Sequence, residues 1–371
     1  MKIAELYVDA QLADWPQTDA ACRQFGMSAR TVQSAHEVYA AVAASPDPIE
    51  RGKHVLYLTR NKGAFIKSCP GTRHYTCCGY KILHIGTFCS MDCSYCILQA
   101  YFHPPVLQYF LNHDQMESEL EQLFASGAIH RLGTGEFTDS LIWEPWTGLS
   151  AGLVRRFAGQ DRCVLELKTK TTFSEALLEL PHRRRTILSW SLNAERVIGA
   201  EERGTAALDA RLRAAARAAG RGYPLAFHFD PIVIDEGCAT EYCRAVERLF
   251  AAVDSRHVVW ISLGALRFMP ELKAVVQRRF EHSRILHGEF IDGLDGKMRY
   301  FKPLRMKVYR DIVDAIRAHA PEVCVYLCME DDEAWRHALG FTPAERGGLA
   351  RMLDEAAAGR CGLDRPEHGL S

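Results

Sequence analysis

Six short apolar segments alternate with amphipathic segments along this 371-residue chain, and this alternation constrains the fold more than any other feature. Strands are predicted at residues 81–86, 129–132, 163–167, 186–192, 225–229 and 258–263, and helices at 113–125, 173–180, 206–219, 241–253 and 271–279. Strands separated by helices pair in parallel through right-handed crossovers, and strands apolar on both faces lie beneath helices. The sequence therefore predicts an α/β fold, a partial (β/α)6 barrel of the TIM type, with its chemistry on the loops that follow the strands.

Both ends of the chain extend beyond these segments. Two helix-like pieces, at residues 20–25 and 35–44, precede the barrel and carry no motif. We expect an N-terminal accessory region at 1–78, the barrel at 79–330 and a C-terminal helical tail at 331–371.

The composition is that of a soluble enzyme. Lys and Arg number 45 against 46 Asp and Glu, so the net charge of −1 gives no general argument for nucleic acid or membrane as a partner. No apolar run reaches the roughly 18 residues that a membrane span needs. Six of the 13 cysteines fall between Cys69 and Cys96, which favours metal chemistry in a reduced, cytoplasmic compartment over a secreted disulfide framework.

The first predicted barrel strand ends in a loop with three cysteines, Cys89, Cys93 and Cys96, in the spacing C-x3-C-x2-C. Three thiolates on one short loop can hold three corners of a cubane iron–sulfur cluster, which leaves one iron open to a small molecule. Zinc is the alternative, although zinc sites usually pair C-x2-4-C with a second, distant Cys/His pair. We predict that the three cysteines bind a catalytic [4Fe-4S] cluster.

Polar residues also follow three later strands. Gly133 and Gly135 would let the backbone approach a ligand closely, and Glu136 would offer a carboxylate to an ammonium group. The alternative is a plain strand-to-helix turn. The next two strands lead to Lys170 and to the Ser191-Leu-Asn193 segment, whose alternatives are a solvated lysine and loop capping.

The cysteine spacing resembles the radical S-adenosylmethionine (SAM) superfamily, and collinear segments resemble its spore photoproduct lyase family. After the cysteines, the segments that carry the resemblance are Leu98-Gln99, Thr138-Asp139, Thr169-Lys170, Ser191-Leu-Asn193 with Arg196-Val-Ile198, Asp230-Pro-Ile232, Arg267-Phe268 and Lys307-Val-Tyr309-Arg310. The family fold is likewise a partial barrel.

The resemblance implies two cofactors, a [4Fe-4S] cluster and SAM. It places Tyr95 against the adenine of SAM, and it places Thr138, Lys170 and Ser191 where the family contacts SAM, the last two near its carboxylate. Gly135 and Glu136 resemble a Gly-Gly-Glu motif that holds the SAM amino group, and Asn193 is expected beside them.

The implied activity is lyase or repair chemistry. An electron donor such as flavodoxin or ferredoxin would reduce the cluster, and a 5′-deoxyadenosyl radical would act on a nucleic-acid base in DNA or a nucleotide. The alternatives are a radical SAM enzyme with a different substrate, and a cluster-containing nucleic-acid-binding or redox-sensing protein without turnover.

Two positions depart from the family's repair enzymes. Those enzymes return a hydrogen atom from a cysteine where this chain has Glu136, and they place a relay tyrosine where it has Ile97. We therefore predict poor repair of spore photoproduct unless another thiol reaches the site. Cys69, Cys77 and Cys78 are the candidates, and the alternatives for them are core packing and a second metal site.

Two stretches mix cations with aromatic residues or cluster cations alone. Residues 297–310 could pair phosphates and stack bases, and residues 182–185 add a cationic patch. The alternative for both is a solvated face.

Overall fold

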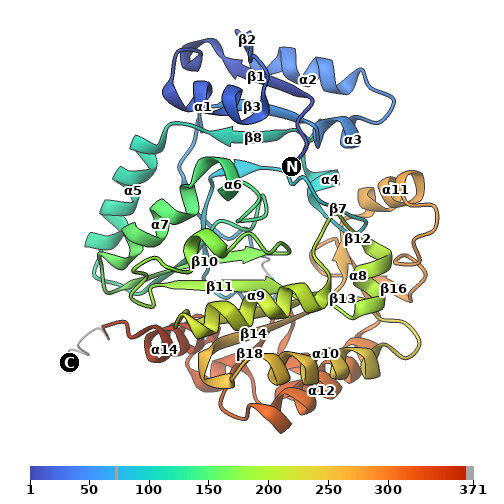
Figure 1. Cartoon of the computed structure of the whole chain (residues 1–371). Helices are drawn as coiled ribbons and strands as arrows, with labels where there is room; N and C mark the ends of the chain where they lie inside the picture. Colours follow the sequence, from blue (N-terminus) through green and yellow to red (C-terminus); the bar gives the residue numbers. More distant parts are fainter. Residues whose placement is uncertain (72–73, 365–371) are drawn as a thin grey trace.

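The structure, a computed structural model, describes residues 1–71 and 74–364. Its two main sheets are an eight-stranded sheet, which forms the barrel, and a five-stranded sheet built around the N-terminal region (Figure 1). In this view the five-stranded sheet lies above the barrel, and the first residue lies between the two.

The barrel sheet has the strand order β18-β14-β13-β11-β10-β9-β5-β4. All neighbouring strands are parallel except β4 and β5, which are antiparallel. The strands are β4 (Ile66–Ser68), β5 (Lys81–Leu83), β9 (His130–Gly133), β10 (Cys163–Thr169), β11 (Thr186–Ser191), β13 (Leu225–Ile232), β14 (Val258–Ala265) and β18 (Cys324–Leu327). The predicted partial barrel and its six strands are confirmed, and β18 extends the parallel run by one strand.

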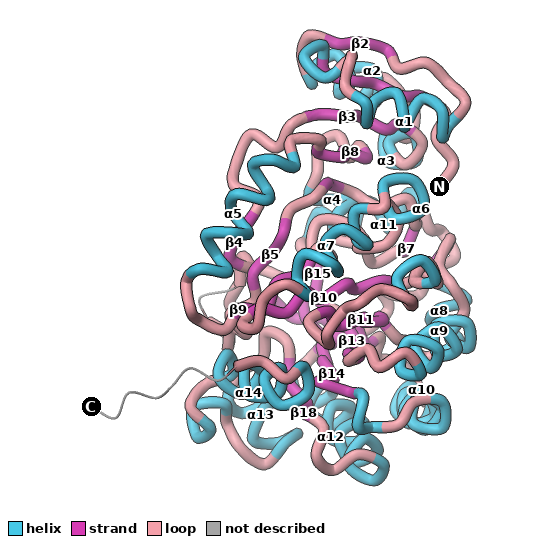
Figure 2. The backbone as a smooth tube through the Cα atoms, turned by 60° about the vertical axis from the view of Figure 1, so that its left-hand side comes forward, coloured by secondary structure: helices cyan, strands magenta, loops and turns pink. Residues whose placement is uncertain are grey.

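Helices cover the outside of the curved barrel sheet (Figure 2). They include α5 (His113–Ala125), α7 (Leu149–Ala158), α8 (Glu195–Glu201), α9 (Leu208–Gly220), α10 (Cys238–Ala252) and α12 (Lys302–His319). Every residue of β11 and of β14 is buried. Their apolar runs therefore face side chains on one side of the sheet and helices on the other, as in other parallel sheets.

One predicted helix is wrong. Residues 173–180 form only a short 3-10 turn, η2 (Glu175–Leu177). The Thr171 hydroxyl accepts the Phe173 N–H at 3.2 Å, which competes with a helical start, and Pro181 disfavours helical geometry in the residue before it. The other predicted barrel helices are present as α5, α9, α10 and α11 (Pro270–Arg279).

The five-stranded sheet has the order β2-β1-β3-β8-β6. Its strands are β1 (Glu5–Asp9), β2 (Arg30–Val32), β3 (Val55–Thr59), β6 (Gly86–Thr87) and β8 (Leu107–Phe110), and its helices are α1 (Pro16–Phe25), α2 (Ala35–Ala43) and α3 (Pro48–Gly52). Leu56 of β3 pairs with Leu107 of β8, so residues beyond position 100 complete this sheet. The expected division at residue 78 does not coincide with the boundary between the two sheets.

The C-terminal segment belongs to the barrel core. It contains α13 (Asp332–Leu339), the 3-10 turn η4 (Pro343–Arg346) and α14 (Leu349–Cys361), with residues 365–371 outside the described part. Helix α14 packs against β14 and β18 and buries Leu349, Leu353 and Cys361. The expected helical tail is thus helical in its described part, and it covers the last barrel strands.

Short elements gather at the end of the barrel where the strands finish. They are α4 (Leu98–Tyr101), α6 (Glu144–Thr147), the strand pair β7 (Asp92–Cys93) and β12 (Glu202–Arg203), and the three strands β15 (Arg267–Phe268), β16 (Phe290–Asp292) and β17 (Met298–Tyr300). Two 3-10 turns, η1 (Ala10–Leu12) and η3 (Ser255–His257), lie elsewhere.

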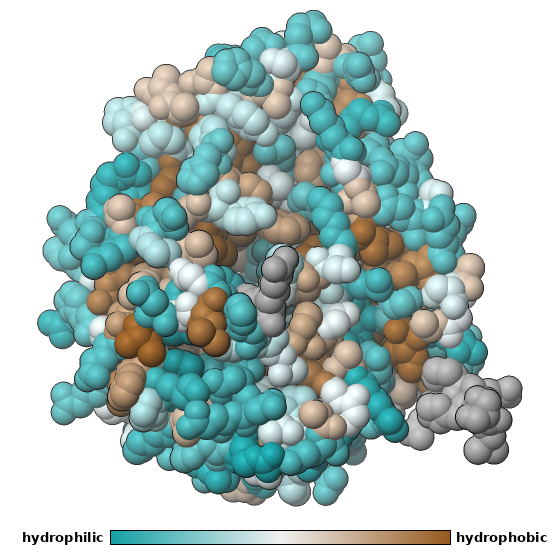
Figure 3. Space-filling model, turned by 180° about the vertical axis from the view of Figure 1, so that it is seen from behind, coloured by the Kyte–Doolittle hydropathy of each residue, from teal (hydrophilic) through white to brown (hydrophobic). Residues whose placement is uncertain are grey.

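The surface opposite the view of Figure 1 is mainly hydrophilic, with hydrophobic residues in small separate groups (Figure 3). Within residues 1–71 and 74–364, no helix is both long enough and apolar enough to span a bilayer.

Candidate active site

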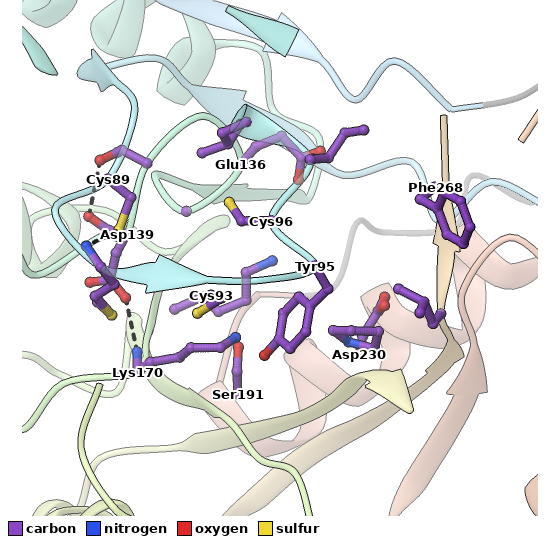
Figure 4. A pocket seen from close by; sticks show the side chains of 18 of the residues that line it. Cys89, Cys93, Tyr95, Cys96, Glu136, Asp139, Lys170, Ser191, Asp230 and Phe268 are labelled. Carbon is purple, nitrogen blue, oxygen red and sulfur yellow. Dashed lines mark hydrogen bonds between the residues drawn. The ribbon is translucent and has the colours of Figure 1, made fainter. Parts of the chain in front are cut away.

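One cavity of about 320 Å³ opens at the end of the barrel where the strands finish, and its volume is in the range of small-molecule sites, roughly 300–1,000 Å³. The loops after β5, β9, β10 and β14 and the carboxyl ends of strands β10, β11 and β13 all contribute to its wall. It brings together nine of the predicted site residues, Cys89, Cys93, Tyr95, Cys96, Gly135, Glu136, Thr138, Lys170 and Ser191 (Figure 4).

The three cysteines of the motif share one wall of this cavity. Cys89 and Cys93 are buried, with exposed fractions of 8% and 6%, and Cys96 is half-buried. Burial raises the pKa of the Cys89 thiol to about 12 and that of Cys93 well above its usual value. In the described part of the chain, no three Cys, His, Asp or Glu side chains have the spacing to hold a single metal ion. Thiols that occupy separate corners of a cubane lie farther apart than the ligands of one ion, and the shared wall fits that arrangement.

The cysteine loop is held by two distant cations. Buried Lys53, from the N-terminal region, donates to the Cys89 carbonyl at 3.3 Å and lies 3.4 Å from the Asp92 carboxylate. Arg279 of α11 donates to Asp92 at 2.7 Å. Gln99 of α4 donates to the Cys93 carbonyl at 2.7 Å. The three thiols are therefore positioned by contacts from outside the motif, and the sequence pattern alone did not reveal Lys53 or Arg279.

Tyr95 and Lys170 form the wall beside the thiols. The Lys170 ammonium lies 5.7 Å from the centre of the Tyr95 ring. The Tyr95 hydroxyl donates to Glu202, which also forms a fully buried ion pair with Arg211. Burial alone would raise the pKa of Glu202, but Lys170 and Arg211 together hold it below its usual value. A carboxylate that stays charged behind Tyr95 fixes the direction of that ring.

Asp139 ties the loops after β9 and β10 together. Its carboxylate accepts the Lys170 N–H at 2.9 Å, the Leu141 N–H at 3.0 Å and the Thr169 hydroxyl at 2.8 Å. The neighbouring Thr138 hydroxyl accepts the Trp143 indole N–H at 3.0 Å. The backbone of the predicted residue Lys170 is thus positioned by Asp139, and the side chain of Thr138 by Trp143.

Asn193, which the sequence places among the SAM contacts, does not line the cavity. Its amide nitrogen donates to the Pro231 carbonyl at 3.0 Å, and its amide oxygen accepts the Ala194 N–H at 3.0 Å and the Tyr242 hydroxyl at 2.5 Å. Because these bonds engage both ends of the buried amide, Asn193 holds the strand end in place and is not free to bind a ligand.

Glu136 and Lys170 belong to different sides of the cavity. Figure 4 shows Glu136 at the top of the view, Lys170 and Ser191 at the bottom, and Cys93 and Cys96 between them. Burial would lower the pKa of Lys168. The carboxylates of Glu136, Glu166 and Asp230 nevertheless raise this pKa above its usual value. Burial is the main cause that raises the pKa of Cys69, and the Glu136 carboxylate raises it further. Since the amino and carboxylate groups of SAM share one carbon atom, this separation argues against Glu136 holding the amino group while Lys170 and Ser191 hold the carboxylate.

The side away from Lys170 contains cations that the sequence did not assign to the site. Arg267 of β15 lies on the cavity wall and donates twice to Asp230, at 3.2 and 3.1 Å. Lys168 and Lys297 line the same cavity. Lys168 and Asp230 lie near the ends of the predicted strands β10 and β13. Lys297 lies in the β16–β17 hairpin, which the sequence pattern did not predict.

The cations of the basic stretch at residues 297–310 are paired with carboxylates, so this stretch is not a bare cationic face for nucleic acid. Arg299 is paired with Asp295 at 2.7 Å, and Arg305 with Glu330 at 2.9 Å, and all four side chains are buried. Arg183 and Arg185, from the other predicted patch, both pair with Asp161. Of these cations, Lys297 is the one that reaches the cavity wall.

Comparison with known proteins identifies the family. The family model described as spore photoproduct lyase matches residues 74–311, which is more than half of the chain. The chain belongs to the spore photoproduct lyase family. Members of the spore photoproduct lyase family are radical SAM enzymes, so this protein is a radical SAM enzyme of the lyase type, a class that uses a [4Fe-4S] cluster and SAM.

Individual relatives agree with this assignment. The spore photoproduct lyase of Bacillus subtilis (strain 168) is 28% identical over 239 residues, which cover 63% of this chain and 68% of the relative. That of Geobacillus sp. (strain Y412MC61) is 25% identical over 236 residues, which cover 61% and 67%.

Solved structures of spore photoproduct lyase share the fold. A cysteine-to-alanine mutant superposes with a TM-score of 0.78 at 21% identity, covering 88% of this chain and 100% of that one. A double mutant with bound SAM and dinucleoside spore photoproduct gives a TM-score of 0.77 with the same identity and coverage.

Proposed function

We propose that this enzyme acts on a thymine photolesion in DNA, of the spore photoproduct type, inside the cavity described above. The observation that carries the proposal is one cavity with two chemically different sides, a thiol wall for the cluster and a cationic side for the substrate. The family and the dinucleoside spore photoproduct bound to related structures support the choice of substrate.

The residues of the thiol wall fit a cubane cluster. Cys89, Cys93 and Cys96 supply three soft donors, and the Met91 N–H points at the Cys89 sulfur at 3.5 Å. A reduced [4Fe-4S] cluster supplies one electron that splits SAM into methionine and a 5′-deoxyadenosyl radical. The protein's part is to keep the thiols in register through Lys53 and to exclude water from the buried wall.

SAM is best accommodated beside the thiols. The Lys170 ammonium and the Ser191 hydroxyl can bind its carboxylate, and Tyr95 offers a ring face to the adenine. Thr138 completes this part of the wall, and Gly135 lies against Lys168 at the boundary with the cationic side. Asp139 holds the Lys170 backbone and Trp143 holds the Thr138 hydroxyl, so a ligand binds there with little reorganisation.

The lesion would occupy the cationic side. Lys168, Arg267 and Lys297 can neutralise a phosphate or bind base carbonyl groups, and Phe268 adds an aromatic surface. Glu136 and Asp230 limit the net positive charge, which suits a small oxygen-rich ligand better than a long phosphate backbone.

The direct test is anaerobic turnover of the iron-loaded protein with SAM, dithionite and dinucleoside spore photoproduct. We expect 5′-deoxyadenosine together with loss of the photoproduct. Formation of 5′-deoxyadenosine without loss of the photoproduct would indicate another substrate, and absence of both would favour a cluster protein without turnover. Cys93→Ala is the matched inactive control.

A further inference from the structure

The thiols outside the cluster motif gather next to the substrate side of the cavity. Cys69, Cys77, Cys78 and Cys328 line a small second cavity of about 30 Å³. Met329 lines both this cavity and the large one, so the two share a wall. The first three thiols are the candidates that the sequence indicates, and the fold adds Cys328, which follows β18.

Among these four, Cys69 has the closest relation to Glu136. It directly follows β4, and its N–H donates to the Tyr80 carbonyl at 3.0 Å, which fixes it at the β4–β5 edge. Strand β5 pairs with β9, whose following loop carries Glu136. Burial is the largest cause of the raised pKa of Cys69, and the Glu136 carboxylate is the second largest. Cys69 therefore lies two strands along the sheet from the loop of Glu136, the position from which related repair enzymes return a hydrogen atom, in a cavity that adjoins the large one.

Cys328 is held more firmly and at a different place. Arg267 donates to its sulfur at 3.2 Å, and Arg267 is itself fixed by Asp230. Burial raises the pKa of the Cys328 thiol to about 12, and Glu136 is the weakest of the main influences on it. This thiol is thus anchored to the cavity wall through Arg267.

A cysteine must be protonated to donate a hydrogen atom, because a thiolate carries no hydrogen. Burial and the Glu136 carboxylate both favour the protonated form of Cys69. A carboxylic acid at position 136 cannot donate a hydrogen atom, since its O–H bond is too strong, but a carboxylate there can keep a neighbouring thiol protonated. The exchange of cysteine for glutamate at this position is then accompanied by a thiol in the adjoining cavity.

We propose that Cys69 is the hydrogen-atom donor of this enzyme and that Glu136 is its positioning residue, an inference that rests on the proposed function. In the step, the S–H bond of Cys69 breaks and a C–H bond forms on the carbon-centred radical left on the thymine base. The product is a closed-shell thymine and a Cys69 thiyl radical. One electron from the low-potential donor that reduces the cluster, with one proton from solvent, restores the thiol.

The test is turnover of dinucleoside spore photoproduct in D2O by the iron-loaded protein. A thiol exchanges its hydrogen with solvent. The wild-type protein should therefore place one deuterium in each repaired dinucleoside, in the methyl group of the thymine that carried the radical. Cys69→Ala and Cys69→Ser should still consume the photoproduct. Their thymine yield should be at least tenfold lower than that of the wild type, with side products in place of thymine. Cys22→Ala, a half-buried thiol in α1, is the matched control.

A second readout needs no turnover. Alkylation of the iron-loaded protein without SAM, followed by mass spectrometry, gives the reactivity of each cysteine. The photoproduct should slow alkylation of Cys69 at least fivefold and leave Cys22 unchanged. Glu136→Gln should lower the pH at which Cys69 begins to react, because the neighbouring negative charge is gone.

The outcomes separate the two claims. Deuterated thymine at the wild-type yield from Cys69→Ala, or the same loss from Cys328→Ala but not from Cys69→Ala, would overturn the donor assignment and leave the proposed function standing. Absence of deuterium in the wild-type product would also overturn it. If the wild-type protein forms 5′-deoxyadenosine but consumes no photoproduct, the proposed substrate fails and the donor assignment falls with it. Intact 5′-deoxyadenosine formation by the Cys69 variants shows that they fold.

Discussion

Lys168 and Lys170 are two residues apart, yet they face different chemistry. Lys170 lies over Tyr95, beside the thiols, whereas Lys168 is surrounded by the carboxylates of Glu136, Glu166 and Asp230. This division at the scale of single side chains is the basis for proposing one region for SAM and another for the lesion.

We expect Lys170→Met to weaken SAM binding and Lys168→Met to leave it nearly unchanged. A charge-assisted hydrogen bond contributes about 1.5–3 kcal/mol, so the Lys170 variant should lose roughly 10- to 150-fold in affinity. Anaerobic calorimetric titration measures both. Equal losses in the two variants would contradict the division of the cavity.

Glu136→Gln tests the same division from the other side. We expect its SAM affinity to stay within about threefold of the wild type, because Glu136 lies with Lys168 and Cys69, and a charged contact would cost more than that. A loss of tenfold or more would restore the sequence-based reading of Glu136 as a ligand of the SAM amino group. The titration used for the lysine variants applies here unchanged.

The cysteines make the simplest prediction at this scale. Each thiolate holds one corner of the cluster, so Cys93→Ala should lose most of its iron and all 5′-deoxyadenosine formation. Iron analysis and chromatography after anaerobic incubation with SAM and dithionite measure the two quantities. Cys22→Ala should retain both, and normal 5′-deoxyadenosine formation by Cys93→Ala would contradict the cluster assignment.

At the scale of elements, the N-terminal region supports the cluster loop directly. Lys53 follows α3 and reaches two carbonyls of the loop as well as Asp92 of β7. A short loop with no helix or strand longer than two residues depends on such contacts for its shape.

Lys53→Ala should therefore make the cluster labile. Removing one partner of a buried ion pair usually costs about 3–5 kcal/mol, and Arg279 keeps part of the Asp92 pairing, so about 2–3 kcal/mol is expected here. Iron release to a chelator should be faster in Lys53→Ala than in Lys62→Ala, an exposed lysine in the same region. Equal release rates would show that the loop keeps its shape alone.

The elements also show what the sequence could predict. Buried parallel strands such as β10, β11 and β14 begin with short, mainly apolar runs, so their places follow from local pattern. The cysteine loop follows from its spacing. Contacts such as Lys53 with Asp92 join residues far apart in the chain, and no local periodicity encodes them. The role of Asn193 was missed for the same reason, since its partner Tyr242 lies on a later helix.

At the scale of the whole molecule, buried acids act in opposite directions on stability. The pKa of Glu202 is lowered in the folded state from its usual 4.5, so its contribution is full above that value and is lost as the pH falls through the lower, folded pKa. Burial raises the pKa values of Asp139 and Glu144, whose protonation instead relieves a cost of folding as the pH falls. Only a comparison of variants isolates one of these groups.

Glu202→Gln should lower the free energy of unfolding by about 3–5 kcal/mol at pH 7, because Arg211 is left buried without its partner. The difference from the wild type should shrink as the pH falls from 4.5 toward the lower pKa of the folded state, because Glu202 is then protonated in the unfolded chain. Urea unfolding at several pH values measures this. Glu179→Gln, from an exposed ion pair, should change stability by about 0–1 kcal/mol. A pH-independent difference for Glu202→Gln would contradict the assignment.

The way the five-stranded sheet is completed has a consequence for synthesis of the chain. Its strands β6 and β8 lie on either side of the cysteine loop, and β8 joins β3 across about fifty intervening residues. As the chain leaves the ribosome at roughly 5–20 residues per second, the three thiols emerge before the strand that closes the sheet behind them. At this rate the cysteine loop is accessible on a nascent chain for about one to three seconds before β8 emerges. The order of translation therefore gives an assembly factor a period in which to deliver iron and sulfide before folding buries Cys89 and Cys93.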